Sequence, residues 1–248
     1  MFQVKNTIQS SQSPVISIII VVYNSVSSLE KSIFSVITQA YKYIELIIID
    51  GGSSDGTVDV LKKYDDKITY WISEPDKGIY DAMNKGVDKS TGDWIYFLGS
   101  GDLLLDSLAK IVPKLVDHNT IYYGDVFRLD TQNKYAGKFS AYKLAVTNIC
   151  HQAILYPESV FKRHKYKLQY RIQADHILNM DCFGDKQFKF HYIPFVVAIY
   201  EGDGYSANNI DLKYVEDKLY VVKVNFPLNV FLYAFIRRKL SLFIKKLI

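Results

Sequence analysis

Residues 15–102 alternate apolar runs with amphipathic segments, and each apolar run ends in a polar loop. The first run, Ile16–Tyr23, has the length and composition of a parallel strand that is buried on both faces. Further strands are expected at 44–49, 68–72 and 94–98, with helical spacing of apolar residues between them. Strand–helix units repeated in this way predict an α/β fold, with a mostly parallel sheet and helices on both faces.

The loops that follow the four expected strands begin at Tyr23, Asp50, Glu74 and Gly99. In open parallel sheets, ligands bind beyond the carboxyl ends of the strands. All four polar loops should lie at that end, so we expect the functional site there.

The second half is less regular, yet it contains no low-complexity linker. We expect a strand at Ile121–Leu129, a paired strand at Tyr135–Phe139 and a helix at Asp175–Phe183. Both halves should share one core. The expected organisation is an extension at 1–14, one domain at 15–205 with halves 15–117 and 118–205, and a helical tail at 206–248.

The composition excludes several classes of protein. A chain of 248 residues with 49% hydrophobic residues can bury a substantial core, which argues against disorder. Cys150 and Cys182 form no CxxC pair, and residues 1–14 are polar, so we expect a reduced, cytoplasmic protein. The net charge of +4 gives no reason to expect a nucleic-acid partner.

Four stretches of the first half resemble family 2 glycosyltransferases with the GT-A fold. They are IIVVYN at 19–24, IIIDGGSSDGT at 47–57, SEPDKGIYDAMNKG at 73–86 and TGDWIYFLGSGD at 91–102. The second half matches more loosely, through His151-Gln152, Ala174-Asp175 and the turn at 202–206. The resemblance implies a Rossmann-like GT-A domain that binds a nucleotide-sugar donor, most simply a UDP-sugar.

The resemblance places Tyr23 beside the base or ribose, and Asp50 as the acceptor of a hydrogen bond from the base. The alternative for Asp50 is that it caps the Gly51-Gly52 turn. Asp55 fits the same loop pattern, but turn and cap chemistry explains it equally well. The donor-binding positions implied are Tyr23, Asn24, Asp50, Gly52, Lys77, Asp81, Asn84, Ser100, Gly101, His151 and Gln152.

Asp102 is the expected metal ligand. A nucleoside diphosphate leaving group is neutralised by Mg²⁺ or Mn²⁺, which prefer carboxylate oxygens. Most relatives carry a pair of acids here, whereas this chain has Gly99, Gly101 and the single acid Asp102. Gly101 should leave room for the backbone to approach the sugar. The alternative is that Asp102 caps the next helix.

Lys77 precedes a helix in a glycine-containing loop, which suits a phosphate contact, although it would also suit a solvated surface lysine. Asp81 and Asn84 should face the same cleft and hold the sugar or orient the loop. Met83 replaces the arginine that is usual in this helix. His151 with Gln152 should close over the diphosphate or supply a metal ligand, unless the histidine is structural. Tyr205 and Ser206 resemble a mobile turn over the donor.

An inverting transferase needs one base to remove a proton from the acceptor hydroxyl. Asp175 matches the family's acid at the start of a helix, where the helix dipole favours its charged form. The alternatives are a helix-cap role for Asp175, or another base among Asp181, Glu201 and Asp203.

The tail contains no acid after Asp217 and many cations. Ile236, Leu240, Phe243 and Leu247 form an apolar stripe at helical spacing, with basic residues beside it, so we expect the tail to lie on the inner face of a membrane. The alternative is a helix that packs on the core.

The sequence therefore predicts a metal-dependent, inverting glycosyltransferase of surface-glycan biosynthesis, with a glycan or lipid-linked acceptor. The sequence is compatible with both a monomer and a homo-oligomer. A sugar nucleotidyltransferase is disfavoured because Asn24–Ser28 lacks a basic glycine-rich loop. A non-catalytic nucleotide- or glycan-binding module is the remaining alternative, since only one acid stands at Asp102.

Overall fold

The computed structural model of the protein describes residues 13–202 and 209–244, apart from the side chain of Leu242. Within these residues the strands form a single nine-stranded sheet that runs through both halves of the chain. The order is β3-β2-β1-β4-β8-β6-β9-β5, with β7 paired to β6.

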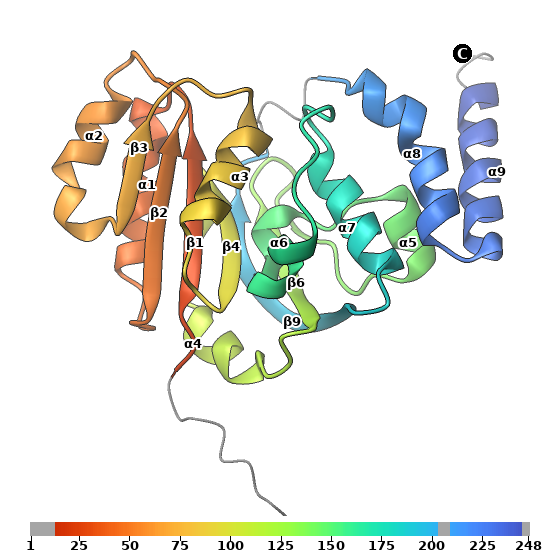
Figure 1. The fold of residues 1–248 in the computed structure, drawn as a ribbon, viewed down its shortest axis with the longest axis horizontal. Coiled ribbons are helices and arrows are strands. Elements are labelled where there is room, and N and C mark those ends of the chain that lie inside the picture. The colour runs from red at the N-terminus through yellow and green to blue at the C-terminus, as the bar shows by residue number, and fades with distance from the viewer. Residues whose placement is uncertain (1–12, 203–208, 245–248) are drawn as a thin grey trace, which may run out of the picture.

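The first half contains four parallel strands. They are β1 (Ile16–Val22), β2 (Ile44–Asp50), β3 (Tyr70–Ser73) and β4 (Trp94–Gly99). Every residue of β1 is buried, as its continuous apolar sequence predicted. From β1 the chain adds β2 and β3 on one side of the sheet and then β4 on the other side of β1. In Figure 1 the carboxyl ends of these strands lie along the upper side of the sheet.

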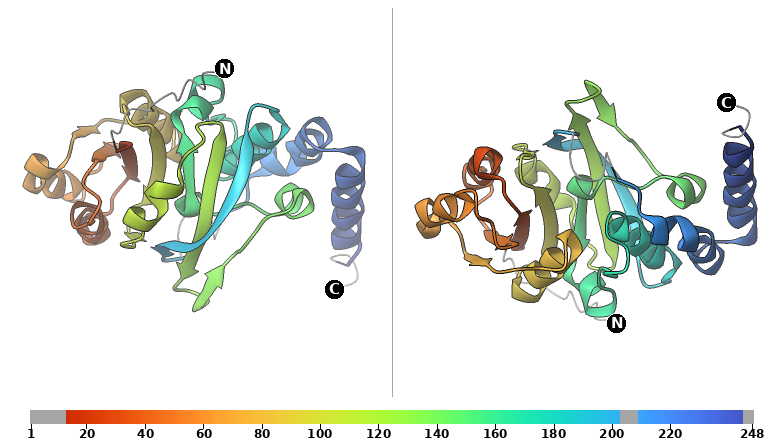
Figure 2. Two further views of the ribbon diagram at one scale, coloured as in Figure 1. Left: turned by 90° about the horizontal axis from the view of Figure 1, so that it is seen from below. Right: turned by 90° about the horizontal axis from the view of Figure 1, so that it is seen from above.

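Helices cover both faces of this part of the sheet. α1 (Val26–Ile37) and α2 (Thr57–Lys63) lie on one face, and α3 (Ile79–Lys89) packs on β1 and β2 from the other (Figures 1 and 2). The predicted α/β sheet with helices on both faces is confirmed. The sheet is parallel throughout the first half, but over its full width four of its eight strand pairings are antiparallel.

The second half extends the sheet with strands of both directions. After β4 come β5 (Leu103–Leu104), β6 (Thr120–Arg128), β7 (Asn133–Tyr135), β8 (Ile154–Pro157) and β9 (Lys189–Tyr200). The partner strand of β6 was predicted at Tyr135–Phe139, which is too late: β7 begins at Asn133. The remaining α-helices are α4 (Leu108–Ile111), α5 (Ala141–Val146), α6 (Glu158–Arg163), α7 (Ala174–Gly184), α8 (Leu212–Asn225) and α9 (Leu228–Ile244).

One buried histidine links three helices of the second half. His176 on α7 places Nε2 2.6 Å from the Leu144 carbonyl oxygen of α5, and Nδ1 2.7 Å from the Tyr214 hydroxyl of α8. Because a carbonyl oxygen only accepts, Nε2 donates to it and Nδ1 accepts from Tyr214. Burial, assisted by the charge of Lys218, lowers the pKa of His176 from 6.5 to about 4.

We expect acid to destabilise the fold through His176. Between pH 6.5 and about 4 the unfolded chain binds a proton that the folded chain excludes, so this contribution is complete above pH 6.5 and is lost as the pH falls. The pKa shift corresponds to about 3 kcal/mol. Urea unfolding across this pH range should show that His176→Gln, which keeps one donor and one acceptor, has lost that part of the pH dependence. A variant with the full wild-type slope contradicts the assignment.

Candidate active site

The strand register brings the predicted site residues to one side of the sheet. Val22 pairs with Asp50, Asp50 pairs with Ser73, and Val21 pairs with Gly99. The loops that follow β1, β2, β3 and β4 therefore begin side by side.

The loop after β1 is tied to the loop after β2. The Asn24 backbone N–H donates to Ser53 Oγ at 2.7 Å, and the Asn24 side-chain oxygen accepts from the Ser54 N–H at 3.0 Å. Asp55 accepts from the Val26 N–H and from Thr57, as the turn-and-cap alternative predicted. Tyr23 points outward with 64% of its surface exposed, which leaves its ring available to a ligand.

Asp50 is placed as the cap of its own turn. It is fully buried, and its carboxylate accepts hydrogen bonds from the Gly52 and Ser53 N–H groups and from the hydroxyls of Ser53 and Ser73. Because the Asp50 side chain is fully buried and accepts four hydrogen bonds within the protein, neither oxygen is accessible to a base. The geometry favours the alternative interpretation of Asp50 over a hydrogen bond to the base.

Asp102 lies at the carboxyl end of β4 with 5% of its surface exposed. Its Oδ2 accepts from Gln152 Nε2 at 2.5 Å, and its Oδ1 accepts from the Glu201 N–H at 3.1 Å. Burial raises the pKa of Asp102, and the hydrogen bond from Gln152 opposes that effect. The helix-cap alternative does not apply, because the next element is the strand β5.

Gly101 does not leave open space, which corrects the sequence-based expectation. A Cβ at this position would lie 2.6 Å from Glu201 Oε2, and the φ of Gly101 is +106°, a region that favours glycine. The Glu201 carboxylate, which pairs with Lys31, therefore occupies the place that a side chain at position 101 would take. Ser100 contacts Ser28 through the two hydroxyls, 3.4 Å apart.

The described residues contain no cluster of three or more His, Cys, Asp or Glu side chains that could hold a metal ion. Asp102 and Glu201 nevertheless bring two carboxylates to the same turn. Each carboxylate oxygen has two lone pairs, so one hydrogen bond does not exhaust it. The arrangement fits a metal ion that is completed by diphosphate oxygens and water.

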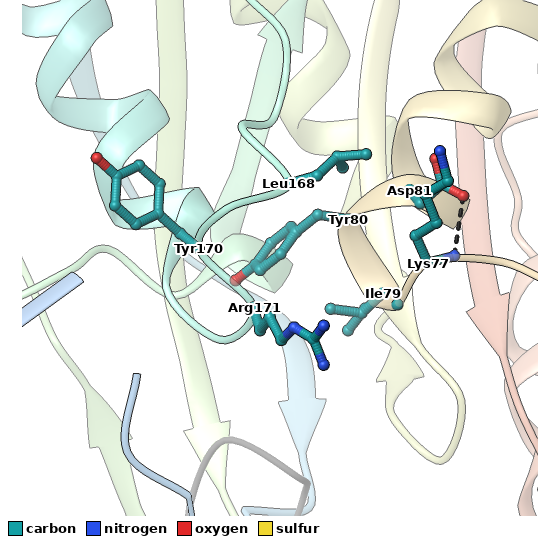
Figure 3. Close-up of a pocket in the computed structure, with 8 residues that line it drawn as sticks. Lys77, Ile79, Tyr80, Asp81, Leu168, Tyr170 and Arg171 are labelled. Atoms are coloured by element: carbon teal, nitrogen blue, oxygen red, sulfur yellow. Dashed lines mark hydrogen bonds between the residues drawn. The ribbon is translucent and has the colours of Figure 1, made fainter. Parts of the chain in front are cut away.

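The start of α3 forms a small hollow with the loop before α7 (Figure 3). Lys77 and Arg171 contribute the cations of its lining, which also includes Tyr80 and Asp81. The Asp81 carboxylate accepts from the Lys77 N–H at 3.0 Å and so fixes the loop. The side chain of Lys77 itself is exposed.

Asn84 anchors the loop before α7. Its side chain donates to the Tyr166 carbonyl oxygen at 2.9 Å and accepts from the Tyr166 N–H at 3.1 Å. This is the loop-orienting role predicted as one option for Asn84. Met83 is buried in the core, so it takes no part in the hollow.

Asp175 stands in the first turn of α7, nearly buried. Its Oδ1 lies 3.0 Å from the Tyr80 hydroxyl, and its Oδ2 lies 3.7 Å from His151 Nδ1. Gln173 holds the N-cap position, so the cap alternative does not describe Asp175. Tyr80 was missed from the sequence because its partner is 95 residues away.

The competing bases are distributed differently. Asp181 accepts from Lys167 and Asn225 on the far part of α7, which leaves it engaged in structural contacts. Glu201 belongs to the Asp102 turn. Asp203 and the turn at Tyr205 and Ser206 lie outside the described residues.

The sequence matches the profile described as Glycosyl transferase family 2 over residues 17–188. The chain belongs to this family. A PGL/p-HBAD biosynthesis glycosyltransferase of Mycobacterium tuberculosis is 36% identical over 207 residues, covering 80% of this chain and 81% of the relative. An uncharacterized glycosyltransferase of Rickettsia typhi is 34% identical over 119 residues, covering 46% of this chain and 37% of the relative.

Solved structures show the same fold at low identity. S. aureus TarS superposes with a TM-score of 0.70 at 13% identity, covering 85% of this chain but only 39% of TarS. Residues 1–349 of TarS in complex with UDP-GlcNAc give the same TM-score, with 66% of that chain covered. The mannosyltransferase PcManGT from Pyrobaculum calidifontis, in complex with GDP-Man and Mn²⁺, gives 0.63 at 16% identity, covering 79% of this chain and 59% of that one. The predicted GT-A fold is confirmed.

Proposed function

We propose that this family 2 glycosyltransferase moves a sugar from a UDP-sugar to an acceptor hydroxyl with inversion at the anomeric carbon. The observation that carries the proposal is the His151–Ala153 turn, which touches both key acids. Gln152 donates to Asp102 at 2.5 Å, and His151 lies 3.7 Å from Asp175. One turn thus contacts both Asp102, on the side of the leaving group, and Asp175, on the side of the acceptor.

In the proposed reaction, Asp175 acts as the general base. Asp175 accepts the proton of the acceptor hydroxyl while that oxygen bonds to the anomeric carbon, and the bond from that carbon to the diphosphate oxygen breaks. The nucleoside diphosphate leaves, and Asp175 returns its proton to water. The His176 N–H donates to Asp175 Oδ1 at 2.8 Å and fixes the carboxylate. The Tyr80 hydroxyl lies 3.0 Å from the same oxygen, but its single proton has a nearer acceptor in the Ile172 carbonyl oxygen at 2.6 Å. Burial raises the pKa of Tyr80, so the hydroxyl stays protonated.

Asp102 and Glu201 would hold a divalent metal ion together with the donor's diphosphate. When bound, such an ion neutralises the charge of the leaving group. Lys77 and Arg171 would add positive charge beside the start of α3. The complexes of TarS with UDP and UDP-GlcNAc support a uridine donor by analogy of fold.

The tail suggests where the acceptor is found. Within the described residues no helix has both the length and the apolarity needed to cross a membrane. α9 contacts α5 and α8 through its inner face, where Val230 and Ala234 are buried. Ile236, Leu240 and Phe243 are instead 56%, 56% and 62% exposed.

The stripe belongs to α9, as do Arg237, Arg238 and Lys239, and α9 lies at the end of the molecule away from β3 (Figure 1). An apolar stripe with flanking cations can enter the headgroup region of an anionic bilayer. We therefore propose a peripheral position on the inner face of the plasma membrane, with a lipid-linked glycan precursor as acceptor and surface polysaccharide as the product. Leu247 of the predicted stripe lies outside the described residues.

Replacing Asp102 by asparagine should lower turnover by more than about a hundredfold, because a lost metal ligand costs more than a lost supporting contact. The measurement is donor-dependent release of nucleoside diphosphate across a Mn²⁺ titration, with thermal unfolding to confirm the fold. Asp106→Asn, an exposed acid in the same segment, is the matched control. Near wild-type activity of Asp102→Asn would remove the metal assignment.

Asp175→Asn should lower turnover by at least about a hundredfold while the KM for the donor changes little, as expected for loss of a general base. Glu216→Gln, an exposed acid of α8, makes the same chemical change away from the site and should be neutral. Normal turnover of Asp175→Asn would transfer the role of base to another acid.

The full chain should co-sediment with phosphatidylglycerol-containing vesicles at low salt. The triple variant Ile236→Ser, Leu240→Ser, Phe243→Ser should remain in the supernatant. A control triple removes equally exposed apolar residues elsewhere, by Phe34→Ser, Tyr43→Ser and Val116→Ser, and should sediment like the wild type. If the wild-type chain stays in the supernatant, the membrane proposal fails.

A further inference from the structure

Two side chains from other loops pack against Gly51, the residue that follows β2. Gly51 has no side chain, and a Cβ built there would lie 2.6 Å from Asp76 Oδ2 and 3.4 Å from a ring carbon of Tyr23. A carboxylate oxygen and an exposed aromatic ring therefore meet above Gly51. Neither belongs to β2, since Tyr23 follows β1 and Asp76 lies in the loop between β3 and α3.

The glycine pair explains how this loop comes so close. A Cβ at Gly52 would stand 3.3 Å from the Pro75 nitrogen, and the φ of Gly52 is +84°. The loop from β3 thus rests on the backbone of Gly51 and Gly52. Gly52, predicted to bind the donor, serves this close approach.

One of the two carboxylate oxygens of Asp76 is hydrogen-bonded within its own loop. Its Oδ1 accepts from the Gly78 N–H at 2.7 Å, and the neighbouring Lys77 N–H is held by Asp81. Across the described residues, Oδ2 takes part in no hydrogen bond or ion pair. The side chain is therefore fixed in place with one acceptor oxygen available beside Tyr23.

We propose that Asp76 selects the base of the donor by accepting a hydrogen bond from a ring N–H, with the base lying against Tyr23. This assignment rests on the proposed nucleotide-sugar chemistry and replaces Asp50, whose oxygens are engaged and buried. Uracil carries such an N–H at N3. Cytosine carries a lone pair at the same atom, which faces the carboxylate unfavourably. Asp76 thus favours a base with a ring N–H, such as uracil, over cytosine.

Calorimetric titration of the full chain with UDP and CDP, each with Mg²⁺, tests this assignment. Wild-type protein should bind UDP at least about tenfold more tightly than CDP, since a hydrogen bond to a charged group is worth that much. Asp76→Asn should bring the ratio close to one. Glu74→Gln removes the same charge from the same loop and should keep the wild-type ratio.

Tyr23→Ala supplies a second measurement, because it should weaken UDP and CDP equally and leave their ratio unchanged. An Asp76→Asn variant that keeps the preference for UDP overturns the assignment, and so does a wild-type protein that binds UDP and CDP equally. Those two results leave the proposed transferase intact. Failure of the wild type to bind either nucleotide overturns the proposed donor chemistry and the assignment together.

Discussion

The hydrogen bond from Gln152 to Asp102 joins the two halves of the active site. Asp102 follows β4, the last of the four parallel strands of the first half, whereas Gln152 belongs to the turn that leads into β8. Tyr96 in β4 donates to the Gln152 carbonyl oxygen at 2.7 Å, so the turn is held at two points. Because His151 precedes Gln152, the same fixed turn presents the imidazole to Asp175. The spacing of the two acids therefore depends on one buried amide.

The sequence predicted the first half well because β1, β2 and β4 are largely buried on both faces. Such strands are nearly continuous apolar runs, and their polar ends mark the carboxyl side of the sheet. β5 was missed because it has two residues and its partner β9 is almost a hundred positions away. Strands that short carry no periodicity of their own.

The sequence predicted where the site residues lie more accurately than it predicted what each of them does. The loops that hold Tyr23, Asp50 and Asp102 do meet, as parallel strands require. The roles of Asp50 and Gly101 differ because distant contacts decide them. Glu201, whose N–H binds Asp102, fills the space at Gly101, and Asp76 fills the space at Gly51. At both glycines an acid from another loop occupies the position of the absent side chain. The residues that directly follow the strands therefore contain fewer acids than the folded site does.

The central claim is that a nucleoside diphosphate lies across the carboxyl ends of β1, β2 and β4. A crystal structure of the full chain with UDP and Mn²⁺ tests this claim most directly. The account predicts electron density for the base against Tyr23 and for the diphosphate beside Asp102, with the metal ion between that diphosphate and the carboxylates of Asp102 and Glu201. Nucleotide bound at another surface, with the ends of these strands empty at saturating UDP, would contradict it.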